Sequence, residues 1–202
     1  MKPYFFLLSL LFGTIMYAQN DYTIHINGQV LDFSLDKEYE IKVNGKPVQF
    51  KVQAKDTLKY KSTLFSFKHS KDYKVSKSII DTGIDQQMIM TADGTGIAIQ
   101  QYTNYNPTML NEVMMTEITK ESLSYGYQLE REDYDRKLTS GQEIRVNKAI
   151  LKYKDDTNIF EVASIGDKDE GIIIITMKMD DNTSSEGQKI IDFMWNTLEY
   201  KL

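Results

Sequence analysis

The residues of this sequence best suited to chemistry are two histidines, His25 and His69. A zinc site needs ligands that converge in space, and two imidazoles need carboxylate help to complete the set. The histidines lie far apart in the sequence, one within and one at the end of an alternating segment. No Gly-x-Ser-x-Gly elbow is present to offer a nucleophile to either ring. We therefore interpret both histidines as surface or edge residues and predict no metal site and no histidine-based triad.

Three acidic clusters raise the question of calcium, because carboxylate and amide oxygens are its ligands. An EF-hand register starting at Asp180 would need glycine at Ser185 and glutamate at Ile191, so it fails. Residues 155–158 and 167–171 are typical of hairpin turns, in which Asp and Asn stabilise the reversal. We predict turns at these clusters.

Four neighbouring acids could supply the carboxylate pair of a glycoside hydrolase. They are Glu130, Glu132, Asp133 and Asp135. Arg and Lys interleave with them, which favours one solvated face of a polar strand.

The glycines of segment 94–96 do not form a dinucleotide fingerprint, because that motif would need glycine at Ile99 and a following helix. The sequence thus predicts no catalytic residue and no cofactor.

Methionines gather around a predicted hairpin and the first predicted helix: Met88, Met90, Met109, Met114 and Met115. Methionine side chains fill cores and also form adaptable binding surfaces. Core filling is the commoner role, but Met115 lies off the main apolar stripe of the predicted helix. We therefore predict a partner-contact surface made of Met109, Met114 and Met115.

Residues 1–18 have the pattern of a cleavable export signal: Lys2, a short apolar run, and Tyr17-Ala18 before polar residues. The run is too short to cross a bilayer comfortably. An uncleaved membrane anchor is the alternative, since Met16 stands where a small residue is expected. The chain has no cysteine, which excludes a lipid-modified amino terminus, disulfides and thiol chemistry. We expect a periplasmic or secreted protein cut near Ala18.

Loss of residues 1–18 removes only one charge, Lys2, and changes the formal net charge from −5 to −6. An acidic balance disfavours a nucleic-acid partner. The remaining length suits one domain of ordinary size with a sizeable core. Thirteen tyrosines and nine phenylalanines against three prolines favour folded, strand-rich structure.

Alternating segments around Asn27-Gly28 and Asn44-Gly45 predict two consecutive hairpins, since Asn-Gly suits a type I′ turn. We assign residues 19–62 to this amino-terminal β-hairpin unit, with a polar stretch, 54–62, at its end. Residues 63–202 form the second predicted domain.

In the second domain, strand patterns cover residues 64–68, 73–80, 87–91 and 97–102. A helix follows from the Asn106 cap to about Leu123, with Leu110, Val113, Met114 and Ile118 on one face. Strand patterns resume at 128–137, 143–153, 159–165 and 172–179. The run 171–176 is apolar on both faces, which predicts a central strand. Thr183 and Glu186 form a capping box for a last helix that buries Ile191, Met194, Trp195 and Leu198. The fold class is α+β, a mostly antiparallel sheet packed by two main helices.

Residues 64–202 resemble the PsbP/Mog1-like superfamily in the order of their elements. An amphipathic opening, residues 64–75, leads to a hairpin, a helix, a meander and a terminal helix ending near Trp195. Members often open with proline and tryptophan, where this chain has Ser70 and Tyr73. The resemblance implies partner binding or assembly and supplies no catalytic residue.

Taken together, these patterns predict an exported, non-enzymatic binding or assembly module of the bacterial cell envelope with a protein partner. An exported hydrolase using carboxylates or a metal is the alternative; a deep pocket holding His69 would favour it. A third possibility is a small apolar ligand held between sheet and helix.

Overall fold

The computed structural model describes residues 22–26, 28–179 and 185–201. The predicted export signal, residues 1–18, and the acidic cluster at 180–184 therefore lie outside the described residues. The chain divides into two compact units, Met1–Ala54 and Lys55–Leu202, and each is described by itself. Among the described residues, no helix is long and apolar enough to cross a membrane.

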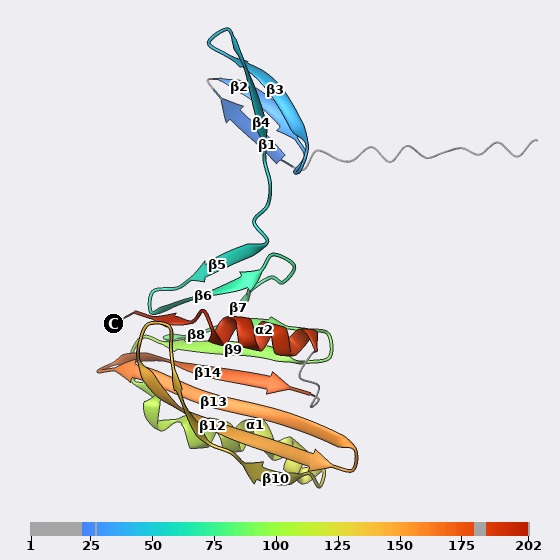
Figure 1. The fold of residues 1–202 in the computed structure, drawn as a ribbon. Helices are drawn as coiled ribbons and strands as arrows, with labels where there is room; N and C mark the ends of the chain where they lie inside the picture. The colour runs from blue at the N-terminus through green and yellow to red at the C-terminus, as the bar shows by residue number, and fades with distance from the viewer. Residues whose placement is uncertain (1–21, 27, 180–184, 202) are drawn as a thin grey trace, which may run out of the picture. The chain divides into compact units, whose positions relative to one another are not determined.

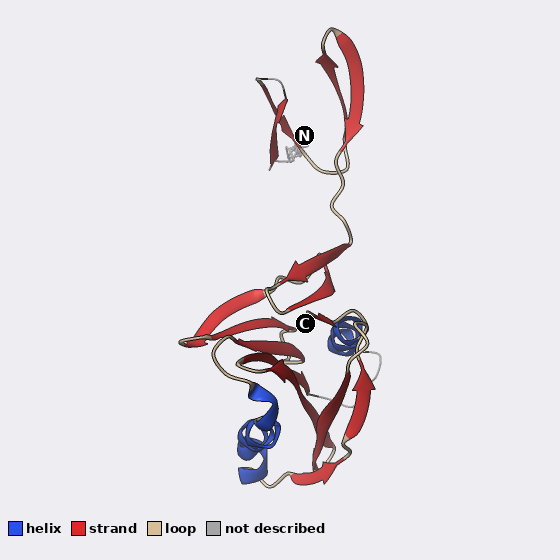
Figure 2. Ribbon diagram, turned by 90° about the vertical axis from the view of Figure 1, so that its left-hand side faces the viewer, coloured by secondary structure: helices blue, strands red, loops and turns tan. Residues whose placement is uncertain are grey.

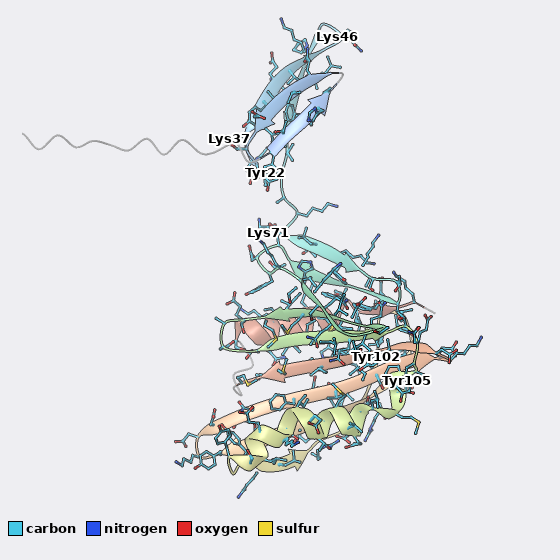
Figure 3. All side chains as sticks on the ribbon, turned by 180° about the vertical axis from the view of Figure 1, so that it is seen from behind. Tyr22, Lys37, Lys46, Lys71, Tyr102 and Tyr105 are labelled. Carbon is cyan, nitrogen blue, oxygen red and sulfur yellow. The ribbon has the colours of Figure 1, made fainter. Side chains whose placement is uncertain are left out.

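The first unit consists of the two predicted hairpins. Strand β1 (Tyr22–Ile26) pairs with β2 (Gln29–Phe33), and β3 (Glu38–Val43) pairs with β4 (Lys46–Lys51). At the second turn, Asn44 has φ 53° and Gly45 has φ 79°, as the predicted type I′ turn requires. Asn27 of the first turn lies outside the described residues. Aromatic rings join the hairpins: Tyr22, Phe33, Tyr39 and Phe50. Figure 3 labels Tyr22 on the first hairpin and Lys46 on the second.

The division between the units falls after Ala54 rather than after residue 62. The polar stretch contains a strand, β5 (Thr57–Lys61), which pairs with β6 (Phe65–Ser70). Tyr60 packs against Phe65 and Phe67 at ring-centroid distances of 6.0 and 5.3 Å. Backbone pairing with β6, together with the packing of Tyr60, places β5 in the second unit.

An eight-stranded antiparallel sheet forms the body of the second unit, in the order β10-β12-β13-β14-β9-β8-β7, with β11 also paired to β12. The strands are β7 (Ser76–Asp81), β8 (Ile84–Met90), β9 (Gly96–Tyr102), β10 (Gln128–Arg131), β11 (Tyr134–Lys137), β12 (Glu143–Tyr153), β13 (Asp156–Asp167) and β14 (Glu170–Lys178). A small sheet has the order β15-β6-β5, in which β15 (Glu199–Tyr200) pairs with β6. These elements confirm the predicted α+β class.

Helix α1 (Asn111–Ser124) and helix α2 (Glu186–Trp195) cover opposite faces of the large sheet (Figures 1 and 2). Strand β14 lies between β13 and β9, and its side chains enter both layers. Ile172 and Ile174 join the core under α2, whereas Ile173 and Ile175 join the core under α1. All four are at most 4% exposed. This confirms the predicted central strand.

A half-buried carboxylate fixes α2 over the sheet. Glu161 accepts hydrogen bonds from Tyr134 (2.8 Å), Thr176 (3.0 Å) and the Trp195 indole (3.2 Å). Burial, together with the neighbouring Glu161 carboxylate, raises the pKa of Tyr134 to about 12. The Arg136 guanidinium lies 4.8 Å over the Trp195 ring. These contacts orient the aromatic end of α2, as charge-assisted hydrogen bonds to a shielded carboxylate do.

Some element boundaries differ from the predicted ones. Asn106 accepts a hydrogen bond from the Thr108 amide (3.1 Å) and caps only a short 3₁₀ turn, η1 (Pro107–Met109), so α1 begins separately. The predicted strand at 73–80 begins only at Ser76. Ser185 accepts from the Gln188 amide (3.2 Å) and caps α2, while Thr183 lies outside the described residues.

The predicted strand 128–137 is split into β10 and β11. At the break, the Asp133 carboxylate accepts from the Lys148 amide (3.0 Å), while the Glu132 amide donates to the Lys148 carbonyl (3.1 Å). A side chain thus takes the place of part of the ladder, as at a bulge.

Because β14 is buried on both faces of the sheet, its side chains should contribute strongly to the stability of the second unit. Replacing Ile174 by Ala should lower the free energy of unfolding of the second unit by about 2–5 kcal/mol, since a buried cavity forms. Ile79→Ala, at a side chain that is 80% exposed, should change it by no more than about 0.5 kcal/mol. Urea denaturation measures both, and equal effects would contradict the assignment of β14 as the core strand.

Candidate functional site

A cleft opens between β6 and α2, with a volume of about 420 Å³. Its base is apolar and comes from Ile89 of the large sheet and from three residues of α2: Ile190, Phe193 and Met194. Its rim carries six polar or titratable residues: Lys68, His69, Ser70, Tyr73, Glu186 and Lys189. An apolar hollow with a few polar groups at its edge is the usual form of a binding site. We call it the α2–β6 cleft.

The spacing of α2 supplies one wall of this cleft. Glu186, Lys189, Ile190 and Phe193 stand at i, i+3, i+4 and i+7, and therefore share a helix face. Ile191, Met194, Trp195 and Leu198 are buried as predicted. The helix thus presents two adjacent faces, one to the core and one to the cleft.

His69 lies in the cleft, but no nucleophile is poised beside it. Its Nδ1 atom is 2.9 Å from the Ser70 carbonyl oxygen, which fits a protonated Nδ1 and leaves Nε2 as an acceptor. The neighbouring Ser70 hydroxyl donates to Asp72 at 2.8 Å. That serine is therefore directed to an exposed carboxylate and not to the imidazole, so the pair does not form a catalytic dyad.

Tyr73 and Glu186 both line the rim of the cleft. The pKa of Tyr73 is raised to about 12, chiefly by the interaction of its hydroxyl with the Glu186 carboxylate and further by burial. The hydroxyl oxygen is shielded from solvent and makes no hydrogen bond of standard geometry with the described residues. The raised pKa therefore reflects the nearby Glu186 carboxylate together with the shielding of the phenol. Tyr73 is then neutral at any physiological pH.

Neither unit contains both histidines. His25 is exposed in β1 of the first unit, whereas His69 belongs to β6 of the second. Within the described ranges, no group of three His, Cys, Asp or Glu side chains could hold a metal ion.

The four neighbouring acids near β10 and β11 pair with basic side chains across the sheet. Glu130 contacts Lys152 (2.8 Å), Glu132 contacts Lys148 (2.7 Å), and Asp135 contacts Arg145 (3.1 Å). Asp133 contacts Arg131 (3.1 Å). Although burial opposes ionisation, hydrogen bonds from the Lys148 amide and Arg131 hold the pKa of Asp133 below its usual value. The arrangement is a solvated, ion-paired strand face, as the interleaved basic residues indicate.

The remaining polar motifs are turns. Segment 154–155 joins β12 to β13, and segment 168–169 joins β13 to β14. Gly94 lies in the turn from β8 to β9, and Gly96 is the first residue of β9. Lys154 and Lys168 have φ values of 55° and 45°, the left-handed conformation that such tight reversals use.

The predicted methionine surface is not brought together as expected. Met109 is 87% exposed, Met114 is half-buried and Met115 is 2% exposed within the core under α1. The prediction for Met115 is wrong, because α1 is rotated so that Met115 and Thr119 face the sheet while Val113 is 56% exposed.

Sequence reasoning missed Tyr73, Glu186 and Phe193 as members of one cleft. The spacing of Glu186 and Phe193, seven residues apart on α2, indicates that they share one helix face and could have pointed to the cleft. Tyr73 gave no such signal, since it follows β6 in a loop and reaches α2 only through tertiary structure.

The fold and the cleft define an α+β domain with an apolar-based cleft beside α2. Among solved structures the chain is similar to the solution structure of cyanobacterial PsbP (CyanoP) from Synechocystis sp. PCC 6803, with 10% sequence identity and a TM-score of 0.47. The match covers 72% of this chain and 93% of that chain. No family model and no curated protein matches the chain.

The Tyr73–Glu186 pair predicts a pH effect. A folded-state pKa of about 12, above the ordinary value of 10.0, contributes stability that is fully present below pH 10 and is lost as the pH rises toward 12. Glu186→Gln should lower the pKa of Tyr73 toward 10. The measurement is a pH titration of phenolate absorbance, from which the titration of a Tyr73→Phe protein is subtracted to isolate Tyr73.

Glu130→Gln, at the opposite end of the sheet, is the matched control and should leave the pKa of Tyr73 unchanged. An unaltered pKa in Glu186→Gln would show that burial alone raises it.

Proposed function

We propose that the mature chain is a non-enzymatic binding module of the bacterial cell envelope, periplasmic or secreted, that holds a protein partner through the α2–β6 cleft. The observation that carries this proposal is the cleft itself. Its base is apolar, its volume is about 420 Å³, and the Ser70 hydroxyl at its rim donates to Asp72 rather than to another rim residue.

The cleft is large enough for one or two apolar side chains of a partner. Phe193 is half-buried at its wall, while Ile190 and Met194 below it are at most 9% exposed. A rigid base with an accessible aromatic edge is the arrangement found at binding hot spots. Lys68 and Lys189 at the rim supply the charged border that such sites have.

One observation favours the rival function, an exported hydrolase. His69 lies in a deep cleft together with Tyr73 and Glu186, and its Nε2 is the atom that a base would use. The binding function has the better support, because the Ser70 hydroxyl donates to Asp72 and the Tyr73 proton is held at high pKa. Neither hydroxyl is activated as a nucleophile.

The export pattern of residues 1–18 supports the location. We expect the protein recovered from a bacterial envelope fraction to begin at Gln19. Mass spectrometry of its intact chain and its amino-terminal peptide tests this. A chain beginning at Met1 would instead support a retained anchor.

The binding function predicts a loss of partner capture on changing the cleft wall. Phe193→Ala should reduce native cross-linking to envelope proteins by about tenfold or more, since truncating a central aromatic removes most of a hot spot's contribution. The matched control is Val113→Ala, an apolar side chain of α1 that is 56% exposed and lies outside the cleft.

Turnover distinguishes the two functions. Under the binding function, His69→Asn leaves any hydrolysis of ester, peptide or glycoside substrates at the level of the unaltered protein. Activity that falls on this substitution, together with unaltered cross-linking in Phe193→Ala, would refute the proposal and establish the hydrolase.

A further inference from the structure

A second hollow lies on the opposite face of the large sheet, beside the carboxyl-terminal half of α1. Its volume is about 480 Å³. Figure 2 shows α1 and α2 on the two sides of the sheet, so the two hollows face different directions. Its lining comes from α1, the segment after it, β13 and the end of β14: Glu117, Ile118, Glu121, Ser122, Tyr125, Tyr127, Asn158, Phe160, Met177 and Met179. We call it the α1-side hollow.

The base of this hollow is apolar and adaptable. Met177 and Met179 are half-buried and pack with Ile118 against the core under α1. On β9, Gly96 pairs with Met177 of β14 on one side and with Met90 of β8 on the other. Met90 is also half-buried and therefore lies two strands away from Met177. Unbranched thioether side chains repack around differing apolar partners. These methionines are not the ones predicted for a contact surface, Met109, Met114 and Met115.

The rim of the hollow carries two acidic residues of α1, Glu117 and Glu121, whose positions do not stabilise the helix. Glu117 and Glu121 stand at i and i+4, where like charges repel. They lie toward the carboxyl end of α1, whose last turn carries no basic residue, although carboxylates are disfavoured at that end. Lys120 offsets Glu117 at 3.8 Å, whereas Glu121 makes no ion pair with the described residues. A local conflict of this kind is typical of a functional surface.

We propose that the α1-side hollow binds a basic amphipathic segment of a second protein. Apolar side chains of that segment would contact Met177, Met179 and Phe160, and its Lys or Arg side chains would face Glu117 and Glu121. Tyr125, 70% exposed, adds an aromatic edge of the type enriched at interfaces.

The charge of the rim selects this partner chemistry. An anionic lipid head group or a nucleic-acid phosphate would meet the two carboxylates and be repelled. An acidic peptide would be repelled in the same way. This inference does not rest on the α2–β6 cleft. With both surfaces occupied, one copy of the protein would join two partners across its sheet.

The test uses two fluorescent peptides of about 18 residues, long enough for several helical turns. One alternates leucine and lysine in a helical amphipathic pattern, and the other has glutamate in place of lysine. The leucine–lysine peptide should bind the full chain at least about tenfold more tightly in fluorescence anisotropy. Its affinity should fall as salt is added, because exposed charges are screened.

Two charge-matched variants locate the binding. Glu117→Gln with Glu121→Gln should weaken the leucine–lysine peptide by about fivefold or more, since the rim loses both charges. Glu143→Gln with Glu170→Gln removes the same charge from exposed positions outside the hollow and should change the affinity by less than about twofold. Met179→Lys should weaken binding, whereas Met109→Lys should not. These limits are order-of-magnitude expectations for rim charges and buried contacts.

Each alternative result overturns the inference. Equal losses in the two charge-matched variants would mean that net charge alone attracts the peptide. Equal binding of both peptides would mean that the acidic rim has no role. Phe193→Ala should leave peptide affinity unchanged, so failure here and failure of the cleft as a partner site are separate results.

Discussion

The burial of β14 on both faces is the interaction on which the rest of the second unit depends. Consecutive isoleucines alternate between the core under α2 and the core under α1, with exposures of at most 4%. Because one strand contributes to both layers, each helix packs against a sheet already held together from the other side. Each candidate binding surface lies beside one of the two helices, and the sheet between the helices sets its position.

The two faces of the sheet differ in chemistry. On the α2 face, Glu161 gathers three neutral donors, and the nearby cleft has a rim with two lysines, a histidine and a phenol–carboxylate pair. On the α1 face, the base is rich in methionine and the rim carries Glu117 and Glu121. The rim residues therefore differ between the two faces: Lys68, Lys189 and Glu186 at the α2–β6 cleft, and Glu117 and Glu121 at the α1-side hollow.

Local pattern predicted most of the elements. Asn44-Gly45 specified its turn, and the apolar run 171–176 specified a central strand. Predictions were weaker where one tertiary contact outweighs a local signal. Tyr60 brings a polar stretch into the second unit, Asp133 interrupts a strand by taking the Lys148 amide, and the rotation of α1 buries Met115. In each case the deciding contact is with a residue outside the segment, and the periodicity of the segment itself does not encode it.

By itself, the sequence determined the α+β class, the hairpins, the core faces of β14 and α2, and the ion-paired nature of the acidic strands. These follow from alternation, helical spacing and turn chemistry, which act over a few residues. Only tertiary structure decided that Tyr73 meets Glu186, that His69 shares a cleft with Phe193, and that half-exposed methionines lie beside an acidic helix end. Such sites arise where elements distant in sequence pack together, so their chemistry depends on a register and a helix rotation that local spacing does not encode.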